Sequence, residues 1–133
     1  MTPRLVFDSN ALLKFFQGEP GAPAVERWLR TAARRRWIKY LCAINLGEII
    51  YATKRQYGDQ RKIEVLGHIH RMNFTVLPAP DDLIFQAAEY KAEYSIAYGD
   101  CFVLACAVNH AAAIVTGDPE FKKVSHLAKI HWV

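Results

Sequence analysis

The sequence predicts an α/β fold in which a parallel sheet is covered by helices on both faces. Short apolar runs typical of buried strands alternate along the chain with longer segments of helical character, and this alternation is typical of parallel sheets. The length of 133 residues fits a single domain, which we place over residues 1–133. Hydrophobic residues make up 52% of the chain and charged residues 23%, so the domain can build its own core.

Two strands and four helices are predicted in the first half of the chain. The strands are the runs 4–7 and 38–43, and the helices cover 9–16, 23–34, 45–57 and 59–72. A Gly-Glu-Pro-Gly turn ends the first helix. The second helix carries one apolar stripe, formed by Ala24, Val25, Trp28, Leu29 and Ala32. The fourth helix is expected to start on Asp59 as its cap.

Three strands and three helices are predicted in the second half. The strands cover 74–77, 113–116 and, at an edge, 129–132, and the helices cover 81–94, 100–109 and, as a short helix, 119–125. Acidic residues suit the first turn of the helix that begins with Asp81 and Asp82. The segment 100–109 is apolar nearly all round, so we expect a buried central helix there.

Several classes of protein are disfavoured by features that the sequence lacks. Three cysteines without a Cys-x-x-Cys pair support neither a disulfide framework nor a zinc site, and they favour a reducing, cytoplasmic compartment. The longest apolar run, 101–108, is far below the roughly 20 residues that span a bilayer, and no signal-like stretch precedes Asp8, so we expect no membrane association. No Gly-rich phosphate loop follows a strand, and the histidines lack metal-ligand spacing.

Four acidic residues stand where predicted strands end or helices begin: Asp8, Glu48, Asp100 and Asp118. The carboxyl ends of parallel strands share one edge of the sheet, and ligands bind outside that edge. Each acid also has a purely structural interpretation, because such residues cap helices. These alternatives are a cap by Asp8 or Ser9, a capping box of Asn45 with Glu48, a cap or first-turn acid at Asp100, and a cap by Asp118.

Taken together, the four acids favour a metal site over four separate caps. Unit charges ~5 Å apart repel by about 3 kcal/mol per pair at an effective dielectric near 20, so converging carboxylates become protonated or bind a cation. Oxygen ligands without His or Cys select hard ions such as Mg²⁺ or Mn²⁺. Such an ion polarises a phosphate and lowers the pKa of attacking water, which is the chemistry of phosphodiester hydrolysis.

The residues around each acid form a distinct sequence motif: FDSNALLKFF at Asp8, INLGEII at Glu48, YGDCFVLACA at Asp100 and IVTGDPEF at Asp118. These motifs resemble those of the PIN-domain nucleases, and in particular of the VapC-type toxin ribonucleases of toxin–antitoxin pairs. The resemblance covers nearly the whole chain in the family's order. It implies a three-layer α/β/α sandwich with a central parallel sheet, a Mg²⁺ or Mn²⁺ site, and endonucleolytic cleavage of RNA.

The resemblance also implies roles for the matching residues. Asp8, Glu48, Asp100 and Asp118 would form the catalytic set. Asp8, Asp100 and Asp118 would hold the metal, with Asp8 and Asp100 as the most direct ligands. All four positions keep a carboxylate, so nothing in the sequence indicates an inactive enzyme.

Residues that would contact the substrate come from two sources. The resemblance implies that Ser9 or Asn10 supports the site or contacts RNA, and that Thr116 supplies a hydroxyl beside the acids. The net charge is only +4, but five basic residues crowd into 30–39, namely Arg30, Arg34, Arg35, Arg36 and Lys39. They form either the solvated end of a helix or a surface that contacts phosphates. In the second case Lys14 and the run Arg34, Arg35 and Arg36 would hold the RNA backbone.

A cognate antitoxin is the partner that the resemblance implies, with its tail in an apolar groove that leads to the acidic site. A homodimer and a hetero-oligomer with the antitoxin are the expected assemblies. Apolar residues of the first two helices would form either the core or this groove. Two other functions stay open: a PIN nuclease of RNA processing without an antitoxin, and a non-catalytic α/β binding module whose stability does not depend on divalent metal.

Overall fold

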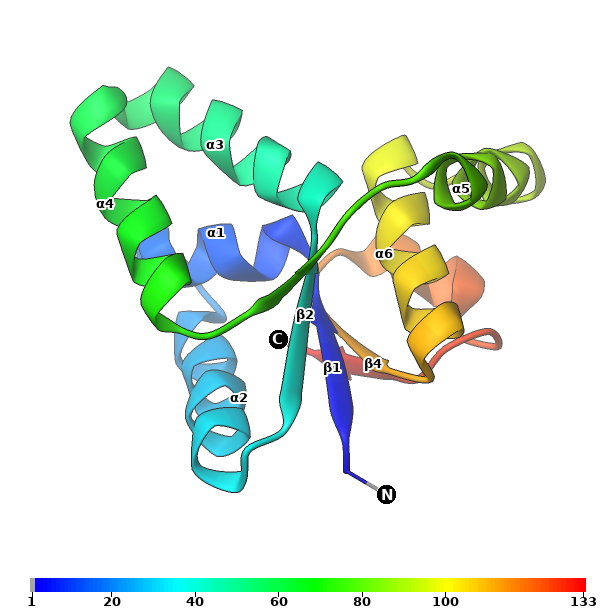
Figure 1. The fold of residues 1–133 in the computed structure, drawn as a ribbon, viewed down its shortest axis with the longest axis horizontal. Coiled ribbons are helices and arrows are strands. Elements are labelled where there is room, and N and C mark those ends of the chain that lie inside the picture. Colours follow the sequence, from blue (N-terminus) through cyan, green and yellow to red (C-terminus); the bar gives the residue numbers. More distant parts are fainter. Residues whose placement is uncertain (1) are drawn as a thin grey trace.

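The computed structural model describes residues 2–133, and five parallel strands lie at its centre (Figure 1). They are β1 (Arg4–Phe7), β2 (Ile38–Cys42), β3 (Thr75–Leu77), β4 (Ala113–Thr116) and β5 (Ile130–Trp132). Their order in the sheet is β3-β2-β1-β4-β5, and each neighbouring pair is parallel. The predicted parallel sheet is therefore confirmed, with β1 in the middle and the carboxyl ends of all strands at one edge.

Helices cover both faces of this sheet, which confirms the three-layer α/β/α sandwich (Figure 1). One face packs against α1 (Ser9–Gln17), α2 (Ala22–Arg35), α3 (Ala43–Tyr57) and α4 (Asp59–Arg71). The other packs against α5 (Asp81–Glu93), α6 (Tyr98–His110) and the 3-10 helix η1 (Pro119–Val124). Within residues 2–133, no helix combines the length and the apolar character that crossing a membrane requires.

The core consists of two apolar clusters, one on each face of the sheet. Leu5 and Phe7 of β1 point into the cluster under α1–α4, whereas Val6 points into the cluster under α5 and α6. A strand covered on both faces needs apolar residues at every position, which explains the uninterrupted apolar run. Helix α6 is buried from Asp100 to Ala107, as expected for a central helix.

The start of α3 and the cap of α4 differ from the sequence-based expectation, and α6 begins at Tyr98, two residues before the predicted start. Helix α3 begins at Ala43, because β2 passes directly into it through Cys42, which keeps an extended backbone. The predicted cap at Asp59 is wrong, since the tight link between α3 and α4 needs a positive φ of 90° and Gly58 takes the capping position. The Asp59 carboxylate instead accepts a hydrogen bond from Lys62 at 3.1 Å.

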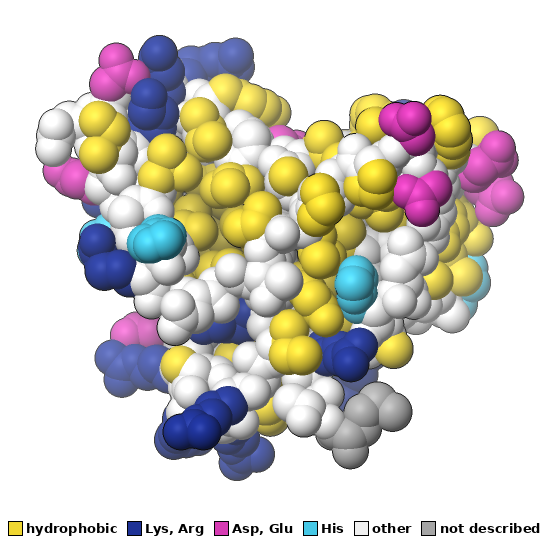
Figure 2. All heavy atoms as spheres, viewed as in Figure 1, with side chains coloured by type: hydrophobic (Ala, Val, Ile, Leu, Met, Phe, Trp, Pro, Cys, Tyr) yellow, Lys and Arg dark blue, Asp and Glu magenta, His cyan; other side chains and the backbone are white. Residues whose placement is uncertain are grey.

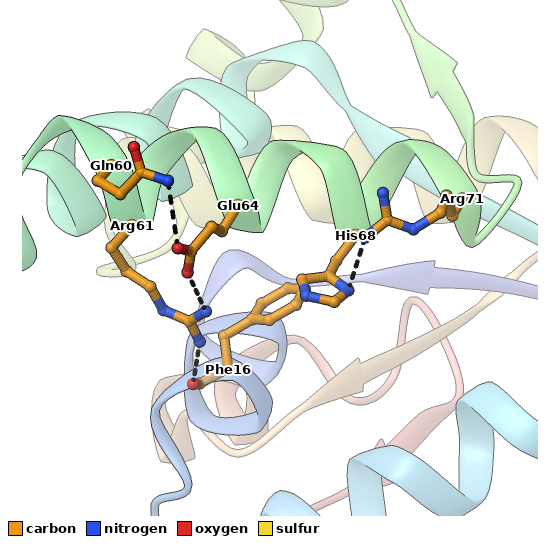
Figure 3. Close-up of polar contacts among 6 residues, drawn as sticks. All are labelled: Phe16, Gln60, Arg61, Glu64, His68 and Arg71. Atoms are coloured by element: carbon orange, nitrogen blue, oxygen red, sulfur yellow. Dashed lines mark hydrogen bonds and ion pairs between the residues drawn. The ribbon is translucent and has the colours of Figure 1, made fainter.

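Helix α4 is fastened to the end of α1 by polar contacts (Figure 3). The Arg61 guanidinium donates to the carbonyl oxygen of Phe16 at 3.0 Å and to the Glu64 carboxylate at 3.2 Å. The last carbonyl groups of a helix lack partners within the helix, so Arg61 satisfies one of them. This clamp holds α1 in place, and α1 begins directly after Asp8.

Candidate metal centre

Three of the predicted acids meet at the carboxyl edge of the sheet. Asp8 directly follows β1, and Asp118 lies just beyond β4, which pairs with β1. Asp100 is in the first turn of α6. One carboxylate oxygen from each of the three lies within 4.8 Å of the others. The topology produces this cluster, because neighbouring parallel strands place the residues that follow them side by side.

Helix capping accounts for only one of these acids. Asp118 caps η1, since its Oδ1 accepts a hydrogen bond from the backbone N–H of Glu120 at 3.0 Å. Asp8 occupies the N-cap position of α1, but its side chain makes no capping hydrogen bond. Asp100 lies inside α6 and does not cap it. Asp8 therefore stands at the cap position without capping through its side chain, and Asp100 is not a cap but the first-turn acid that is the other structural interpretation of this residue.

Burial raises the pKa of two of the three carboxyl groups. Asp8 is 1% exposed, and its loss of hydration, with repulsion from Glu48 and Asp118, raises its pKa to about 6. Burial of Asp100, beside the charges of Asp8 and Asp118, raises its pKa to about 8. Both shifts measure how unfavourable the ionised cluster is without a cation.

The donor set fits a hard divalent cation. The three side chains offer carboxylate oxygens only, which suits Mg²⁺ or Mn²⁺. The Oδ2 atom of Asp100 is buried and has no hydrogen-bond partner among residues 2–133. A buried acceptor without a partner costs free energy, and a metal ion would remove that cost.

Thr116 and Asn10 hold the cluster in place. The Thr116 hydroxyl donates to Asp8 Oδ2 at 2.8 Å and accepts from the backbone N–H of Asp118 at 3.0 Å. The Asn10 side-chain oxygen accepts from the backbone N–H of Gly117 at 3.1 Å. One hydroxyl thus orients the side chain of one acid and the backbone of another.

We expect Thr116→Val to weaken Mn²⁺ binding by about tenfold, because groups that orient metal ligands contribute on this scale. Loss of the donated hydrogen bond also raises the pKa of Asp8 further, so protons compete more strongly with the metal. Isothermal titration with Mn²⁺ measures the affinity. Thr116→Ser keeps the hydroxyl and should bind Mn²⁺ like the parent protein; equal affinity in the valine variant would show that the hydroxyl does not support the site.

Glu48 lies beside the cluster without being one of its three members. Its Oε1 accepts hydrogen bonds from the Ser9 hydroxyl at 3.1 Å and from the Asn45 amide at 2.8 Å. Asn45 also donates to the carbonyl oxygen of Gly99 at 3.1 Å, which ties α3 to the start of α6. The predicted capping box is wrong, because α3 begins before Asn45 and places it within the helix.

The basic residues named from the sequence occupy two different places. The Lys14 ammonium group lies beside Gly117, the residue before Asp118, and 3.5 Å from the carbonyl oxygen of Val133. Arg34, Arg35 and Arg36 are exposed at the end of α2, where β2 begins (Figure 1). The length of a four-residue strand, about 13 Å, separates that edge from the acidic edge. The structure does not bring the three arginines to the cluster.

Proteins of toxin–antitoxin pairs are among the solved structures that share this fold. VapBC2 from Rickettsia felis, bound to a promoter DNA fragment, matches with a TM-score of 0.77 and 16% identity, covering 96% of this chain and 97% of that chain. DNA-bound VapBC from Salmonella typhimurium gives 0.77 and 17%, covering 98% of each chain. VapC20 from Mycobacterium tuberculosis, a toxin that cleaves the sarcin-ricin loop, gives 0.76 and 15%, covering 90% and 94%.

Comparison with family models and with curated proteins gives two further results. No curated protein matches the sequence. The model of the PIN domain matches residues 5–127, a range that contains all four predicted acids and the whole sheet except its last strand. With this match over most of its length, the chain belongs to the PIN domain family.

Proposed function

We propose that this protein is a Mg²⁺- or Mn²⁺-dependent endoribonuclease and the toxin of a type II toxin–antitoxin pair. The observation that carries the proposal is the convergence of the Asp8, Asp100 and Asp118 carboxylates, with one buried oxygen lacking a partner among residues 2–133. The PIN domain match supports nuclease chemistry for such a cluster. The free energy that destabilises the ionised cluster becomes binding energy for a divalent ion.

In this proposal Asp8, Asp100 and Asp118 hold the metal, and Glu48 orients the attacking water. When bound, the ion neutralises charge on the scissile phosphate and lowers the pKa of water. Glu48 Oε1 is occupied by Ser9 and Asn45, whereas Oε2 makes no hydrogen bond in the part of the chain that the structure describes. Oε2 therefore accepts a hydrogen bond from the attacking water and takes its proton as the water oxygen bonds to phosphorus. The bond to the leaving ribose oxygen breaks, and that oxygen takes a proton from solvent.

Gly99→Ala tests this role of Glu48. A Cβ at Gly99 would lie 2.8 Å from the Glu48 carboxyl carbon, so Glu48 must move. We expect RNA cleavage to fall by about tenfold, the lower end of what a general acid–base group contributes. Affinity for Mn²⁺ should change little, because Glu48 is not a ligand. The matched control is Gly47→Ala, where a Cβ would meet nothing within 4 Å; equal cleavage by both variants would exclude the role.

The substrate is proposed to approach the acidic edge and continue along the protein. Ser9, Asn10 and Thr116 line the acids, and Lys14 supplies a positive charge beside Gly117. Arg34, Arg35 and Arg36 lie too far away to touch the scissile phosphate. We propose that they contact the RNA backbone at a distance, where they contribute affinity and salt dependence without sequence specificity.

A cognate antitoxin is the proposed protein partner. The VapBC structures that share this fold contain toxin and antitoxin together, and two of them are bound to DNA. We extend this assembly to the present chain, with a toxin homodimer inside the hetero-oligomer. The three free, buried cysteines suit the reducing cytoplasm, where such a pair would act.

Cleavage of a mixed RNA pool tests the proposed activity. The purified chain should produce discrete fragments with Mg²⁺ or Mn²⁺ and none with EDTA. Mn²⁺ should also raise the melting temperature in EDTA-stripped protein, as any ligand that binds only the folded state does. Fragments that persist in EDTA would indicate a contaminating nuclease, and the absence of both cleavage and a metal-induced shift would favour the non-catalytic binding module.

A further inference from the structure

A cavity of about 640 Å³ lies between α2 and the turn that follows α4. It shares no residue with the acidic cluster. Phe15, Leu29 and Trp37 form part of its apolar wall. Its charged lining is one-sided, since Glu26 is the single acid against four basic residues: Arg30, Arg36, Lys39 and Arg71.

Lys39 is the unusual member of this lining. It lies on β2, on the face of the sheet under α1–α4, and only 7% of the residue is exposed. Among residues 2–133 its ammonium group has no hydrogen bond and no ion pair, and its near neighbour is the ring of Phe74, 5.5 Å away. Burial lowers its pKa. The Lys39 Nζ atom is not one of the fully buried polar atoms of residues 2–133, so it reaches the space of the cavity. A bound anion would there pair a charge that has no counterion among the described residues.

The arginines around Lys39 differ in their present partners. Arg30 pairs with Glu26 at 2.7 Å, and Arg71 donates to His68 Nδ1 at 3.2 Å (Figure 3). Arg36 has no ion pair among the described residues and stands in the left-handed conformation (φ 57°) that ends α2. Figure 2 shows basic side chains gathered over α2 and the adjoining end of α4. One buried lysine and one exposed arginine are therefore free to receive an anion.

We infer that this cavity binds a nucleotide phosphate, which is held by Lys39 of β2 and by Arg36 at the end of α2. An ammonium group and a guanidinium fork together suit a phosphate oxygen cluster. The half-buried indole of Trp37 lines the cavity, and the Arg35 guanidinium lies over its ring, 5.7 Å from the centroid. A base could stack on this indole if Arg35 moved aside, which an acidic peptide would not require. The site rests on none of the residues of the acidic cluster, so a binding measurement in EDTA tests it independently of nuclease activity.

Thermal unfolding in EDTA at constant ionic strength tests the site with AMP and with inorganic phosphate as probes. At a concentration ten times its dissociation constant, either ligand should raise the melting temperature by about 5 °C relative to chloride at the same ionic strength. Lys39→Met removes the charge while keeping the length of the side chain, and it should abolish the rise. Lys122→Met, at an exposed position, should retain it. No rise in the parent protein, or an equal rise in Lys39→Met, would overturn the inference.

Further variants distinguish a loss of phosphate binding from a failure to fold, and further ligands distinguish an RNA strand from a free nucleotide as the source of the phosphate. Arg36→Asn suits the left-handed conformation and should reduce the rise by at least half even if Lys39→Met does not fold. A 2′-O-methyl oligonucleotide whose affinity falls about tenfold in both variants would identify an RNA strand as the source of the phosphate. If both variants lose AMP binding but keep their affinity for the oligonucleotide, the phosphate that the cavity binds belongs to a free nucleotide. A response to polyglutamate but not to phosphate would overturn the assignment in favour of an acidic peptide.

Discussion

The Asp100→Asn variant is expected to lose RNA cleavage by about 10³-fold and yet to unfold at a higher temperature than the parent protein in EDTA at pH 8. Asn replaces a ligand carboxylate by a neutral amide, and several kcal/mol of metal-dependent stabilisation in the transition state are lost. The same change removes a buried charge that repels Asp8 and Asp118, so the metal-free fold becomes more stable. Fragment yield with Mg²⁺ and melting curves in EDTA measure the two effects.

The opposite signs of these effects distinguish a metal ligand from a structural residue. A residue that only supports the fold would lower activity and stability together. Asp81→Asn is the matched control, because Asp81 is also a first-turn acid of a helix, α5, but is not a member of the cluster. It should keep full cleavage and respond to Mn²⁺ like the parent protein. If the Asp100→Asn variant kept its RNA cleavage, the proposal that Asp100 is a ligand of the catalytic metal would be wrong.

The strands were predictable because their signals are local. The runs 4–7 and 113–116 coincide with β1 and β4, and these strands place Asp8 and Asp118. Once the sheet is taken as parallel, the meeting of these two acids follows from topology. The inclusion of Asp100 follows in turn from the apolar helix behind it, which has to pack under the sheet.

The support around the acids could not be predicted in the same way. Asn45 matched a capping pattern in the sequence, yet it lies inside α3 and holds Glu48 through a contact with Gly99, 54 positions away in the chain. Lys39 appeared as one member of an exposed basic run, whereas the alternation of β2 points it into the core. The contacts of Asn45 depend on packing between distant segments, which leaves no mark in a short segment of sequence. The placement of Lys39 in the predicted strand 38–43 was a local signal, which the basic residues before it obscured.

The metal-free protein should lose stability as the pH rises from about 4 to about 8. The pKa of Asp8 is about 6 and that of Asp100 about 8 in the folded state, against 3.8 for a free carboxyl group. The folded state therefore binds these protons more tightly than the unfolded state does. The stability that they contribute is present in full below the unfolded pKa, and it is lost as the pH passes through the two folded values.

Asp8 alone sets the scale of this loss. The rise in its pKa from 3.8 to about 6 corresponds to about 3 kcal/mol of unfolding free energy at pH 7, or about 10 °C in melting temperature for a domain of this size. Melting curves in EDTA at pH 5, 6, 7 and 8 measure the slope. The double variant Asp8→Asn with Asp100→Asn removes both titrating groups and should show a much flatter profile.

A divalent ion should reverse the trend, and this reversal ties the pH profile to the site. At pH 5 protons occupy the carboxyl groups and compete with Mg²⁺, so the metal-induced rise in melting temperature should be small. At pH 8 both aspartates are free to bind the ion, so the rise should be largest where the metal-free protein is weakest. A stability in EDTA that stayed constant or increased from pH 5 to 8 would mean that the acids do not repel one another as the geometry requires. A metal effect independent of pH would place the ion elsewhere on the chain.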